Sequence, residues 1–337
     1  MRIVALVESV DHVCCRYRVA AFQDTFSAAG HELQIGPLPR TSLARLLIGQ
    51  EIDGADAVIV QRKLLPRWVV AILRRRARRL IFDFDDAVWL RDSYSPRGFD
   101  DPRRSRRFRA MMGACDLVVA GNEYLANEAA RHTPRERVVV IPTCVEPQKY
   151  PTHPASSRSG LQLVWIGSHS TLRGLERFEQ VLSSIGHAVP GTRLKLICDR
   201  FIRIRGLPID ECVWNEATEA TEIAAADVGI SWVPDDPWSR GKCGLKVLQY
   251  QAAALPVIAN PVGVHLEMVR AGETGFPANT TEEWIGAVSQ LAADPSLRRR
   301  LGERARREVE ARFSVAAGAR RWLSALEQLM HALRKSG

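Results

Sequence analysis

Short apolar runs alternate with longer amphipathic segments along the first half of the chain. The apolar runs are rich in Val, Ile and Leu and lie at residues 2–7, 56–61, 80–84, 116–120 and 138–141. A strand that is apolar on both faces suits a parallel sheet that is covered by helices on both sides. The pattern therefore predicts a doubly wound α/β domain over residues 1–146.

The same alternation restarts after a polar stretch. Residues 147–160 contain several Pro, Ser and Thr residues and no hydrophobic period, and are predicted to form a linker. Beyond them we predict strands at residues 161–166, 194–198, 228–232 and 256–259, and helices at residues 171–184, 244–254 and 281–291. A second Rossmann-like domain is thus expected over residues 161–313. Two such domains place their ligands at the carboxyl ends of the strands, in a central crevice where the domains face each other.

Two amphipathic helices are predicted at the end of the sequence. The first begins near Asp294 and is interrupted at Phe313 and Ser314. The second, over residues 314–337, carries large apolar residues on one face. Because such a face must be buried, we expect this helix to dock on the N-terminal domain.

Composition excludes several classes of protein. The chain has 337 residues, of which 46% are hydrophobic, which excludes disordered and collagen-like chains. No apolar run reaches the roughly 20 residues of a membrane span, and the first one is too short for a signal peptide, so a cytoplasmic location is expected. The seven cysteines are scattered without a C-x-x-C pair, which predicts reduced structural thiols and no metal site.

A loop between a predicted strand and a predicted helix carries the best local signal for anion binding. Residues 240–246 (RGKCGLK) combine glycines, three cations and the start of a helix. Backbone N–H groups and a helix N-terminus attract a diphosphate, although a solvated loop is the alternative. The sequence matches neither the P-loop nor the dinucleotide pattern. The candidate contacts are Lys242, Cys243, Gly244, Leu245 and Lys246.

A second candidate is the turn after the first strand of the second domain. In the segment WIGSHSTLRG, Gly167, Ser168 and His169 stand where ligands bind in open parallel sheets. The small side chains leave room for a ligand. A lone histidine such as His169 is more often a capping or solvent-facing residue.

The third candidate is a run of carboxylates at the end of a strand of the first domain. In FDFDD, strand alternation predicts that Asp85 and Asp86 project into the crevice, where they could act as base, hydroxyl acceptor or metal ligand. The alternative is helix capping or pairing with nearby arginines. Arg16 and Arg18, after the first strand, either contact an anionic ligand or begin a helix.

Together these segments resemble the retaining glycosyltransferases of family 4, which have the GT-B fold. Residues 244–259 (GLKVLQYQAAALPVIA) are similar to the family's donor-binding segment G-L-P-x-x-E-A-M-A-x-G-x-P-V-I-A. Three shorter matches are GETGF at residues 272–276, VIPTCV at residues 140–145 and GHEL at residues 30–33. The resemblance implies a nucleotide diphosphate sugar as donor, bound mainly by the second domain, and an acceptor bound mainly by the first.

The chain departs from the family at several donor contacts. Ser168 stands where the family has an arginine, whereas Arg173 keeps the charge of the family's lysine. Gly241 and Gln249 replace two glutamates that normally contact the donor sugar and the ribose. Lys242 and Lys246 could supply the cation that Ser168 lacks, and G-K-C-G with F-D-x-D-D-A-x-W suggests a divergent subgroup. The implied donor site consists of Gly167, Ser168, His169, Arg173, Lys242, Cys243, Gly244, Leu245, Lys246 and Gln249.

The resemblance also implies a mechanism. Arg173, Lys242 and Lys246 would stabilise the leaving nucleoside diphosphate without a metal or other cofactor. Asp85 and Asp86 would orient the acceptor, a glycan, lipid-linked or small-molecule hydroxyl, with Arg16 and Arg18 beside them. The alternatives are a degenerate, non-catalytic transferase that acts as a binding partner and a GT-B sugar-nucleotide epimerase.

The charge of the chain is concentrated in one stretch. Of the net charge of +9, all is carried by residues 62–109, with 15 basic and 6 acidic residues. Helices that end in arginine explain part of it. The rest predicts contact with an anionic membrane surface or an anionic acceptor, against a solvated face as the alternative. Without aromatic residues interleaved among the basic ones, nucleic acid is not expected as a partner.

Overall fold

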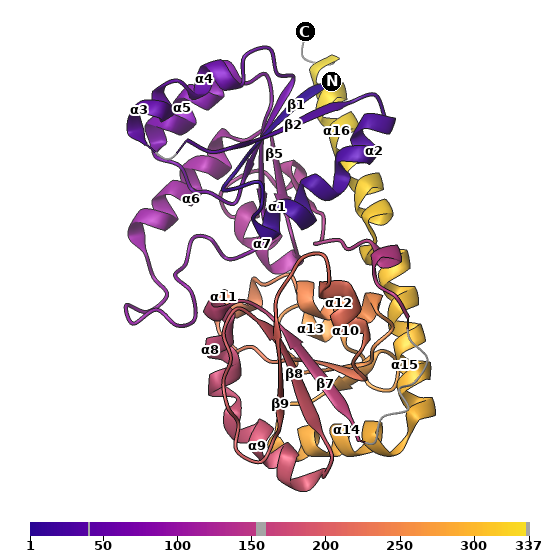
Figure 1. Cartoon of the computed structure of the whole chain (residues 1–337). Helices are drawn as coiled ribbons and strands as arrows, with labels where there is room; N and C mark the ends of the chain where they lie inside the picture. Colours follow the sequence, from indigo (N-terminus) through magenta and orange to yellow (C-terminus); the bar gives the residue numbers. More distant parts are fainter. Residues whose placement is uncertain (40, 153–159, 335–337) are drawn as a thin grey trace. The chain divides into compact units, whose positions relative to one another are not determined.

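The chain forms two compact units that are not contiguous in sequence. The computed structural model describes residues 1–39, 41–152 and 160–334, with side chains as far as His331. The first unit comprises Met1–Cys144, Asp236–Cys243 and Val315–Gly337, and the second comprises Val145–Asp235 and Gly244–Ser314 (Figure 1). This division differs from the predicted domains because the segment Asp236–Cys243 contacts the first unit. Residues 153–159 of the predicted linker and residues 335–337 of the last helix lie outside the described residues.

The first unit is built on a parallel sheet of six strands in the order β2-β1-β3-β4-β5-β6. The five strands that the apolar pattern predicts are confirmed, and one further strand, β2, pairs at the edge. The strands are β1 (Arg2–Val7), β2 (Glu32–Pro37), β3 (Ala57–Gln61), β4 (Leu80–Phe84), β5 (Leu117–Ala120) and β6 (Val138–Val140).

Helices cover both faces of this sheet, as the continuous apolar strands require. One face packs against α4 (Ile48–Glu51), α5 (Arg67–Arg76), α6 (Pro102–Ala114) and α7 (Glu123–Ala130). The other face packs against α1 (Val13–Arg18), α2 (Gln23–Ala28) and the last helix, α16 (Val315–Arg334). The short helix α3 (Ser42–Leu46) lies beside α4 and α5 (Figure 1).

Strand β4 shows how alternation decides which side chain faces which helices. Phe82 and Phe84 point into the core formed with α5 and α6, whereas Ile81 and Asp83 face the layer of α1, α2 and α16. In that layer Trp322 of α16 lies 6.1 Å from the ring centroid of Phe26. The apolar face of α16 is thus buried on the first unit.

The second unit contains another parallel sheet of six strands, in the order β12-β11-β10-β7-β8-β9. The four predicted strands are confirmed, and the two edge strands, β9 and β12, were not predicted. The strands are β7 (Gln162–Ile166), β8 (Arg193–Cys198), β9 (Ile209–Val213), β10 (Val228–Ser231), β11 (Val257–Ala259) and β12 (Gly275–Pro277).

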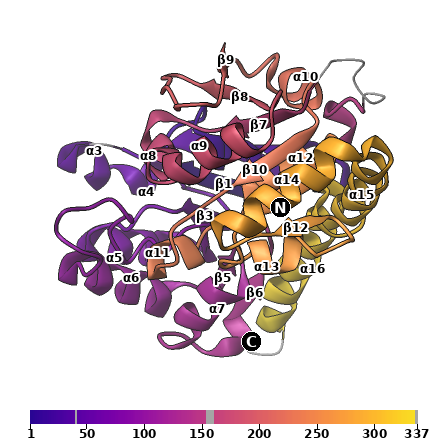
Figure 2. The ribbon, with the colours of Figure 1, turned by 90° about the horizontal axis from the view of Figure 1, so that it is seen from below.

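The helix predicted at residues 171–184 is two helices, separated at the buried Phe178. These two and α14 cover one face of the second sheet, whereas α12 lies on the other face against β10 (Figure 2). The helices of this unit are α8 (His169–Arg177), α9 (Glu179–Ala188), α10 (Glu219–Ala224), α12 (Leu245–Ala252), α13 (His265–Met268), α14 (Thr281–Ala293) and α15 (Pro295–Glu308), followed by a π-helical turn (Val309–Phe313).

Each sheet has one point at which the strand order reverses. This switch point lies between β1 and β3 in the first unit and between β7 and β10 in the second. In open α/β sheets, ligands bind at the carboxyl ends of the strands beside such a point. Each unit therefore carries one place where a site is expected.

None of the helices in the described ranges is long and apolar enough to cross a membrane.

Candidate functional sites

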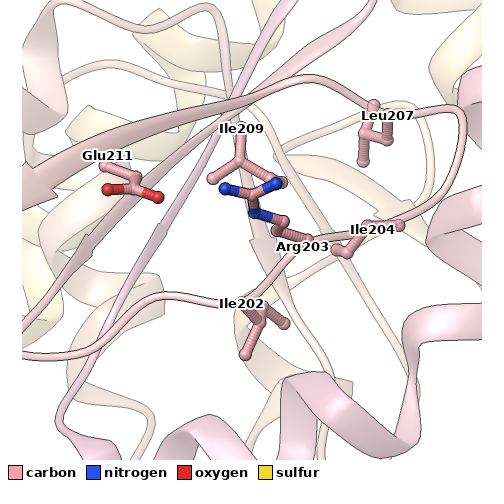
Figure 3. A pocket seen from close by; sticks show the side chains of 6 residues that line it. All are labelled: Ile202, Arg203, Ile204, Leu207, Ile209 and Glu211. Atoms are coloured by element: carbon pink, nitrogen blue, oxygen red, sulfur yellow. The ribbon is translucent and has the colours of Figure 1, made fainter.

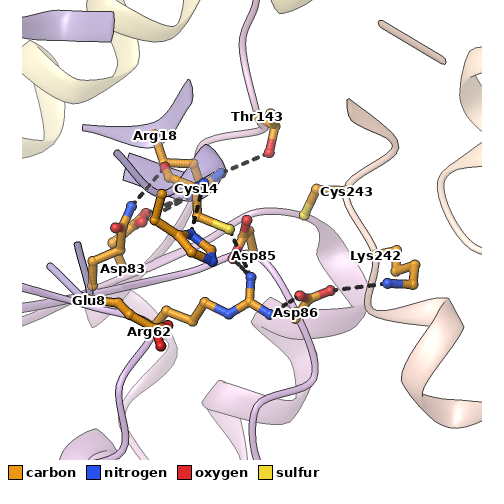
Figure 4. A network of polar contacts seen from close by, with 12 residues as sticks. Glu8, Cys14, Arg18, Arg62, Asp83, Asp85, Asp86, Thr143, Lys242 and Cys243 are labelled. Carbon is orange, nitrogen blue, oxygen red and sulfur yellow. Dashed lines mark hydrogen bonds and ion pairs between the residues drawn. The ribbon is translucent and has the colours of Figure 1, made fainter. Parts of the chain in front are cut away.

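A network of charged side chains surrounds the switch point of the first unit. Glu8 follows β1, Arg62 follows β3, and Asp85 and Asp86 follow β4, so three neighbouring strand ends contribute to it (Figure 4). Lys63 pairs with Glu8 at 2.5 Å. Parallel strands bring these side chains together because all of their carboxyl ends lie at one edge of the sheet.

Beneath this network lies a fully buried ion pair. The Arg18 Nε donates to both Asp83 carboxylate oxygens, at 3.1 and 3.0 Å, and Arg18 Nη1 donates to the Ile141 carbonyl at 3.1 Å. Burial alone would lower the pKa of Arg18, but the Asp83 carboxylate outweighs it and raises the pKa. Only 2% of Arg18 is exposed. Arg18 therefore supports the site from inside, and acceptor binding by Arg18 stays a prediction that its burial does not favour.

Arg62 holds the two carboxylates that follow β4. Its Nη2 pairs with Asp86, and its Nη1 lies 3.4 Å from Asp85 Oδ1 and 2.8 Å from Cys14 Sγ. The backbone of Arg62 has φ +59°, a left-handed conformation that costs a non-glycine residue about 1–3 kcal/mol. Such strain is found where the surrounding structure fixes a side chain for function.

The surroundings of Asp85 keep it ionised. Burial would raise its pKa, but the guanidinium groups of Arg62 and Arg18 outweigh burial and lower the pKa below its usual range. His12 faces the same network, and burial followed by the charge of Arg62 lowers its pKa. Its Nδ1 accepts a hydrogen bond from the backbone N–H of Cys14 at 3.2 Å. The first unit therefore offers a carboxylate beside a neutral imidazole.

Two residues that were predicted to bind the donor belong to the first unit. The Lys242 Nζ lies 3.9 Å from Asp86 Oδ1 and 5.7 Å from the ring centroid of Trp238 (Figure 4). Cys243 is buried in the core beside the network, and burial raises the pKa of its thiol. Donor contact by the Cys243 side chain stays a prediction that its burial does not favour, and the Lys242 ammonium lies beside the carboxylates of the first unit.

Arg16, the other predicted acceptor contact, is half-buried on α1. Its Nη2 donates to the hydroxyl of Tyr17 at 3.1 Å, and its guanidinium lies 5.0 Å from the Tyr17 ring centroid. The two side chains form a neighbouring pair on the helix. Acceptor binding by Arg16 stays a prediction.

In the second unit, the turn after β7 has no room for a larger residue at its first position. A Cβ on Gly167 would lie 2.4 Å from the Trp165 ring and 2.5 Å from the hydroxyl of Thr171. Ser168 is the N-cap of α8, and its backbone N–H donates to the Thr171 hydroxyl at 3.1 Å. The predicted strand-to-helix turn is confirmed, with its glycine required by close packing.

The N-terminus of α8 already carries a carboxylate of the protein itself. Asp199, which follows β8, accepts from the backbone N–H of His169 at 2.7 Å and lies 2.7 Å from the His169 Nδ1. The hydrogen bond with His169 lowers the pKa of Asp199 to about 2. A phosphate placed at this terminus would meet a negative charge. Donor binding by His169 stays a prediction that this pair does not favour.

The N-terminus of α12 lies next to the same turn. The Lys246 Nζ lies 4.0 Å from the centroid of the Trp165 ring, the ring that a Cβ on Gly167 would meet. The hydroxyl of Tyr250 accepts from the backbone N–H of Ile166 at 2.9 Å and fixes α12 to the end of β7. Two segments that are far apart in sequence therefore meet at one indole ring.

The remaining predicted donor contacts lie around α12 and on α8. Gly244, the N-cap of α12, has φ +67°, and a Cβ there would lie 2.7 Å from the Met268 sulfur. Leu245 is half-buried at the first position of the helix, and Gln249 is 4% exposed. Arg173 is exposed on α8. Their contact with a donor stays a prediction.

His265 lies behind this site in the second unit. Its Nδ1 donates to the Asn260 carbonyl at 3.0 Å, and its Nε2 accepts from the hydroxyl of Ser231, at the end of β10, at 3.2 Å. Burial lowers the pKa of His265 to about 4, and Lys246 adds to the lowering. A neutral imidazole thus supports the strand ends at the switch point.

This burial predicts a pH dependence of stability. Between pH 6.5 and pH 4 the unfolded chain binds a proton at His265 and the folded chain does not, so the free energy of unfolding falls as the pH falls, by up to about 3 kcal/mol. Urea unfolding at several pH values should show a smaller loss for His265→Gln than for the wild type. His187→Gln, at an exposed histidine, is the control. Equal losses in the wild type and His265→Gln would contradict the prediction.

An open pocket of about 340 Å³ lies elsewhere in the second unit. It is lined by residues of β9 and of the loop before it, among them Arg203, Leu207 and Glu211 (Figure 3). It lies along the edge strand β9, away from the switch point.

Within the described ranges, no three His, Cys, Asp or Glu side chains are grouped to hold a metal ion.

Several residues of these sites were missed in the sequence. Arg62, His12, Asp199 and Asn122 were not singled out as site residues. Arg62 and Asp199 directly follow predicted strands, so the rule that ligand sites form at strand ends would have found them. Asn122, whose Nδ2 donates to the carbonyls of Gly241 and Lys242, lies two residues after β5. The expectation that the crevice lies between the units stays a prediction.

One segment of the chain matches a known protein family. Residues 237–308 match the family described as "Glycosyl transferases group 1". No curated protein matches the sequence. The matched segment begins in α11 (Pro237–Arg240) and includes Lys246, α12 and His265.

Solved structures resemble the whole chain in fold. Sucrose-phosphate synthase from Thermosynechococcus elongatus has a TM-score of 0.78 at 15% identity, covering 98% of this chain and 100% of that one. HepE from Anabaena in complex with UDP and glucose has a TM-score of 0.71 at 15% identity, covering 97% and 100%. A glycosyltransferase from Rickettsia africae has a TM-score of 0.72 at 13% identity, covering 98% of each chain. These likenesses confirm the GT-B class of fold.

Proposed function

We propose that this chain, which has the GT-B fold and a segment that matches group 1 glycosyl transferases, moves a sugar from a nucleotide diphosphate sugar to a hydroxyl acceptor. The acceptor would be a glycan, a lipid-linked sugar or a small molecule. Retention of anomeric configuration and independence from metal ions are part of the proposal. The observation that carries it is the position of α12, a part of the matched segment, at the switch point of the second unit, with Lys246 above Trp165.

The donor's diphosphate is proposed to bind at the α12 N-terminus. Backbone N–H groups after Gly244 and the ammonium of Lys246 provide positive charge there, and Arg173 adds a further cation. The N-terminus of α8 is less suitable, because Asp199 already accepts its N–H. HepE, a structural neighbour, is described in complex with UDP and with UDP-glucose, which supports a nucleotide-sugar donor.

Asp85 and Asp86 are proposed to bind and orient the acceptor hydroxyl. Both carboxylates pair with Arg62, and their oxygens can accept a hydrogen bond from the attacking hydroxyl and orient it. Stabilisation of the leaving diphosphate by cations then provides most of the catalysis, without a strong base.

A screen of donors tests this function. Thermal unfolding in the presence of UDP-, GDP-, ADP- and dTDP-sugars should give one nucleotide class that raises the Tm, because a ligand at 100 times its Kd stabilises the folded state by about 2.7 kcal/mol. Labelled sugar from that donor should then appear in an acceptor product. An epimerised sugar without acceptor would support the epimerase instead. No stabilisation by any nucleotide sugar would support the non-catalytic alternative.

We further propose that the first unit binds an anionic membrane surface. Large apolar side chains are exposed on and beside α3 and at the start of α5, namely Leu43, Leu46, Leu47 and Trp68. Exposed arginines on α5 and α6 accompany them, namely Arg67, Arg75, Arg76, Arg103, Arg106 and Arg109. Burial and the like charges of Arg103 and Arg45 lower the pKa of Arg107, so positive charge from α3 and α6 is concentrated there. Exposed apolar side chains accompanied by cations are typical of proteins that bind membrane surfaces.

Vesicle flotation tests the membrane proposal. The protein should float with vesicles that contain anionic lipid and not with neutral vesicles, less so at high salt. Arg75→Gln with Arg76→Gln should weaken binding about 30-fold, at about 1 kcal/mol for each charge. Leu43→Ser should also weaken binding to anionic vesicles. The control is Leu266→Ser, at an exposed leucine of the second unit, which should leave this binding unchanged. Equal binding to neutral and anionic vesicles would contradict the proposal, and would leave an anionic acceptor as the reason for the charge.

A further inference from the structure

The segment Asp236–Cys243, here called the strap, is a part of the first unit although its neighbours in sequence belong to the second. It lies between β10 and α12 and contains the short helix α11. Asp236 caps α11 by accepting from the backbone N–H of Ser239 at 2.7 Å, and it also accepts from the hydroxyl of Ser93 at 3.1 Å. The strap is thus held at its first residue by the loop after β4.

Asn122 holds the other end of the strap. Its Nδ2 donates to the carbonyls of Gly241 and Lys242, both at 3.1 Å. Its Oδ1 accepts from the backbone N–H of Leu125 at 2.9 Å and caps α7. Asn122 is 7% exposed, so these bonds form in a buried place where an unsatisfied amide would be costly.

Two glycines allow the strap to lie directly against the backbone of the first unit. A Cβ on Gly241 would lie 2.9 Å from both the Cβ and the backbone nitrogen of Ala87. A Cβ on Gly121 would lie 2.3 Å from the sulfur of Cys243. Gly241 occupies the position where the family has a glutamate, and the close approach to Ala87 leaves no room for any side chain there.

The locked strap places a cation beside the carboxylates. The backbone carbonyl of Lys242 is bonded to Asn122, and its Nζ lies 3.9 Å from Asp86 Oδ1. Arg62 pairs with the same carboxylate. The position of the Lys242 charge therefore depends on the bonds that Asn122 makes to the backbone of residues 241 and 242.

We propose that Asn122 is a positioning residue that acts through Lys242. By locking the strap, it sets the distance between the Lys242 ammonium and Asp86, and so the orientation of the carboxylates that receive the acceptor. This inference rests on the proposed function for its effect on turnover. Its structural part, the lock itself, can be tested without any activity.

Limited digestion with trypsin tests the lock. Asn122→Ser and Asn122→Asp both keep an oxygen that can cap α7 and lose the two donors to the strap. Both variants should be cut after Arg240 or Lys242 at least 10 times faster than the wild type, as read by mass spectrometry. Thr280→Ala, which removes the N-cap of α14 in the second unit, should leave these bonds protected. The proposal would be overturned if trypsin cut the peptide bonds after Arg240 and Lys242 no faster in both Asn122 variants than in the wild type.

A double-mutant cycle tests whether Asn122 acts through Lys242. Asn122→Ser and Lys242→Ala should each lower kcat/KM for the acceptor about 10-fold, and the double variant should also lose about 10-fold, because both remove the same effect. A loss of about 100-fold in the double variant would mean independent roles and overturn the inference. A wild-type protein without transfer activity would remove the proposed function, while the trypsin result would still decide whether Asn122 locks the strap.

Discussion

Replacing Lys246 with alanine should lower turnover by about 100-fold or more. The ammonium lies 4.0 Å above Trp165 at the start of α12, where we place the leaving diphosphate. A preorganised cation that meets charge developing in the transition state contributes on this scale. The measurement is kcat with saturating donor and acceptor. Arg173→Ala should show a loss of similar size, because Arg173 is the other cation assigned to the diphosphate.

Lys246→Arg separates the charge from the packing on Trp165. It keeps a cation that can lie over the indole ring, so it should retain more activity than the alanine variant. Thermal unfolding of each variant checks that the second unit remains folded. Unchanged kcat in folded Lys246→Ala would remove Lys246 from the mechanism, and the same holds for Arg173.

Asp85→Asn should reduce transfer by about 100-fold or more while leaving donor binding unchanged. The two arginines that lower the pKa of Asp85 keep it ionised, so it can accept a hydrogen bond from the attacking hydroxyl and orient it, and loss of a well-placed catalytic carboxylate costs on the order of 10²–10⁴-fold. Calorimetry should give the same Kd for the donor nucleotide in the variant and the wild type. Kinetics with varied acceptor should show the loss.

Asp92→Asn is a matched control for this variant. Asp92 is an exposed carboxylate in the same loop after β4 and is not part of the network. Its variant should therefore retain both sugar transfer and donor binding. If Asp85→Asn instead abolished donor binding, the assignment of Asp85 to the acceptor would be wrong. If transfer were unaffected, Arg62 and Asp85 would form a structural ion pair only.

How much of the fold the sequence predicts depends on where each strand lies in its sheet. Interior strands such as β3 and β10 are buried along their whole length, and their continuous apolar runs identify them. The three strands that the pattern missed, β2, β9 and β12, all lie at sheet edges. An edge strand such as β9 is half-exposed, with no residue of Ile209–Val213 buried, so it has no continuous apolar run. Strand β9 forms because its backbone pairs with the interior strand β8, and not because of an apolar run of its own.

The sites were predictable to the extent that they follow strand ends. Asp85, Asp86, Gly167 and the start of α12 were singled out in this way and lie at or beside the two switch points, and their roles stay predictions. What the pattern could not give is which partner each side chain takes. Asp199 occupies the N-terminus of α8, which no local signal in WIGSHS indicates.

The strap shows a further limit of local patterns. Residues that directly precede α12 were assigned to the donor domain because of their place in the sequence. Their hydrogen bonds to Asn122, 119 and 120 positions earlier, decide otherwise. Such a contact between distant segments depends on tertiary packing, which periodicity does not encode.

The way the chain is divided between its units also limits how it can be recombined. The polypeptide changes unit after Cys144, Asp235, Cys243 and Ser314, so neither unit is one continuous piece of sequence. A chimera cut once, near residue 145, would separate Phe26 from Trp322 and Asn122 from the strap. Exchange of the first unit, to which we assign the acceptor, with that of another protein of this fold therefore calls for a three-part transplant, in which residues 236–243 and the closing helix are moved together with the N-terminal segment. A library built this way would test acceptor choice while keeping every donor residue of the second unit in place.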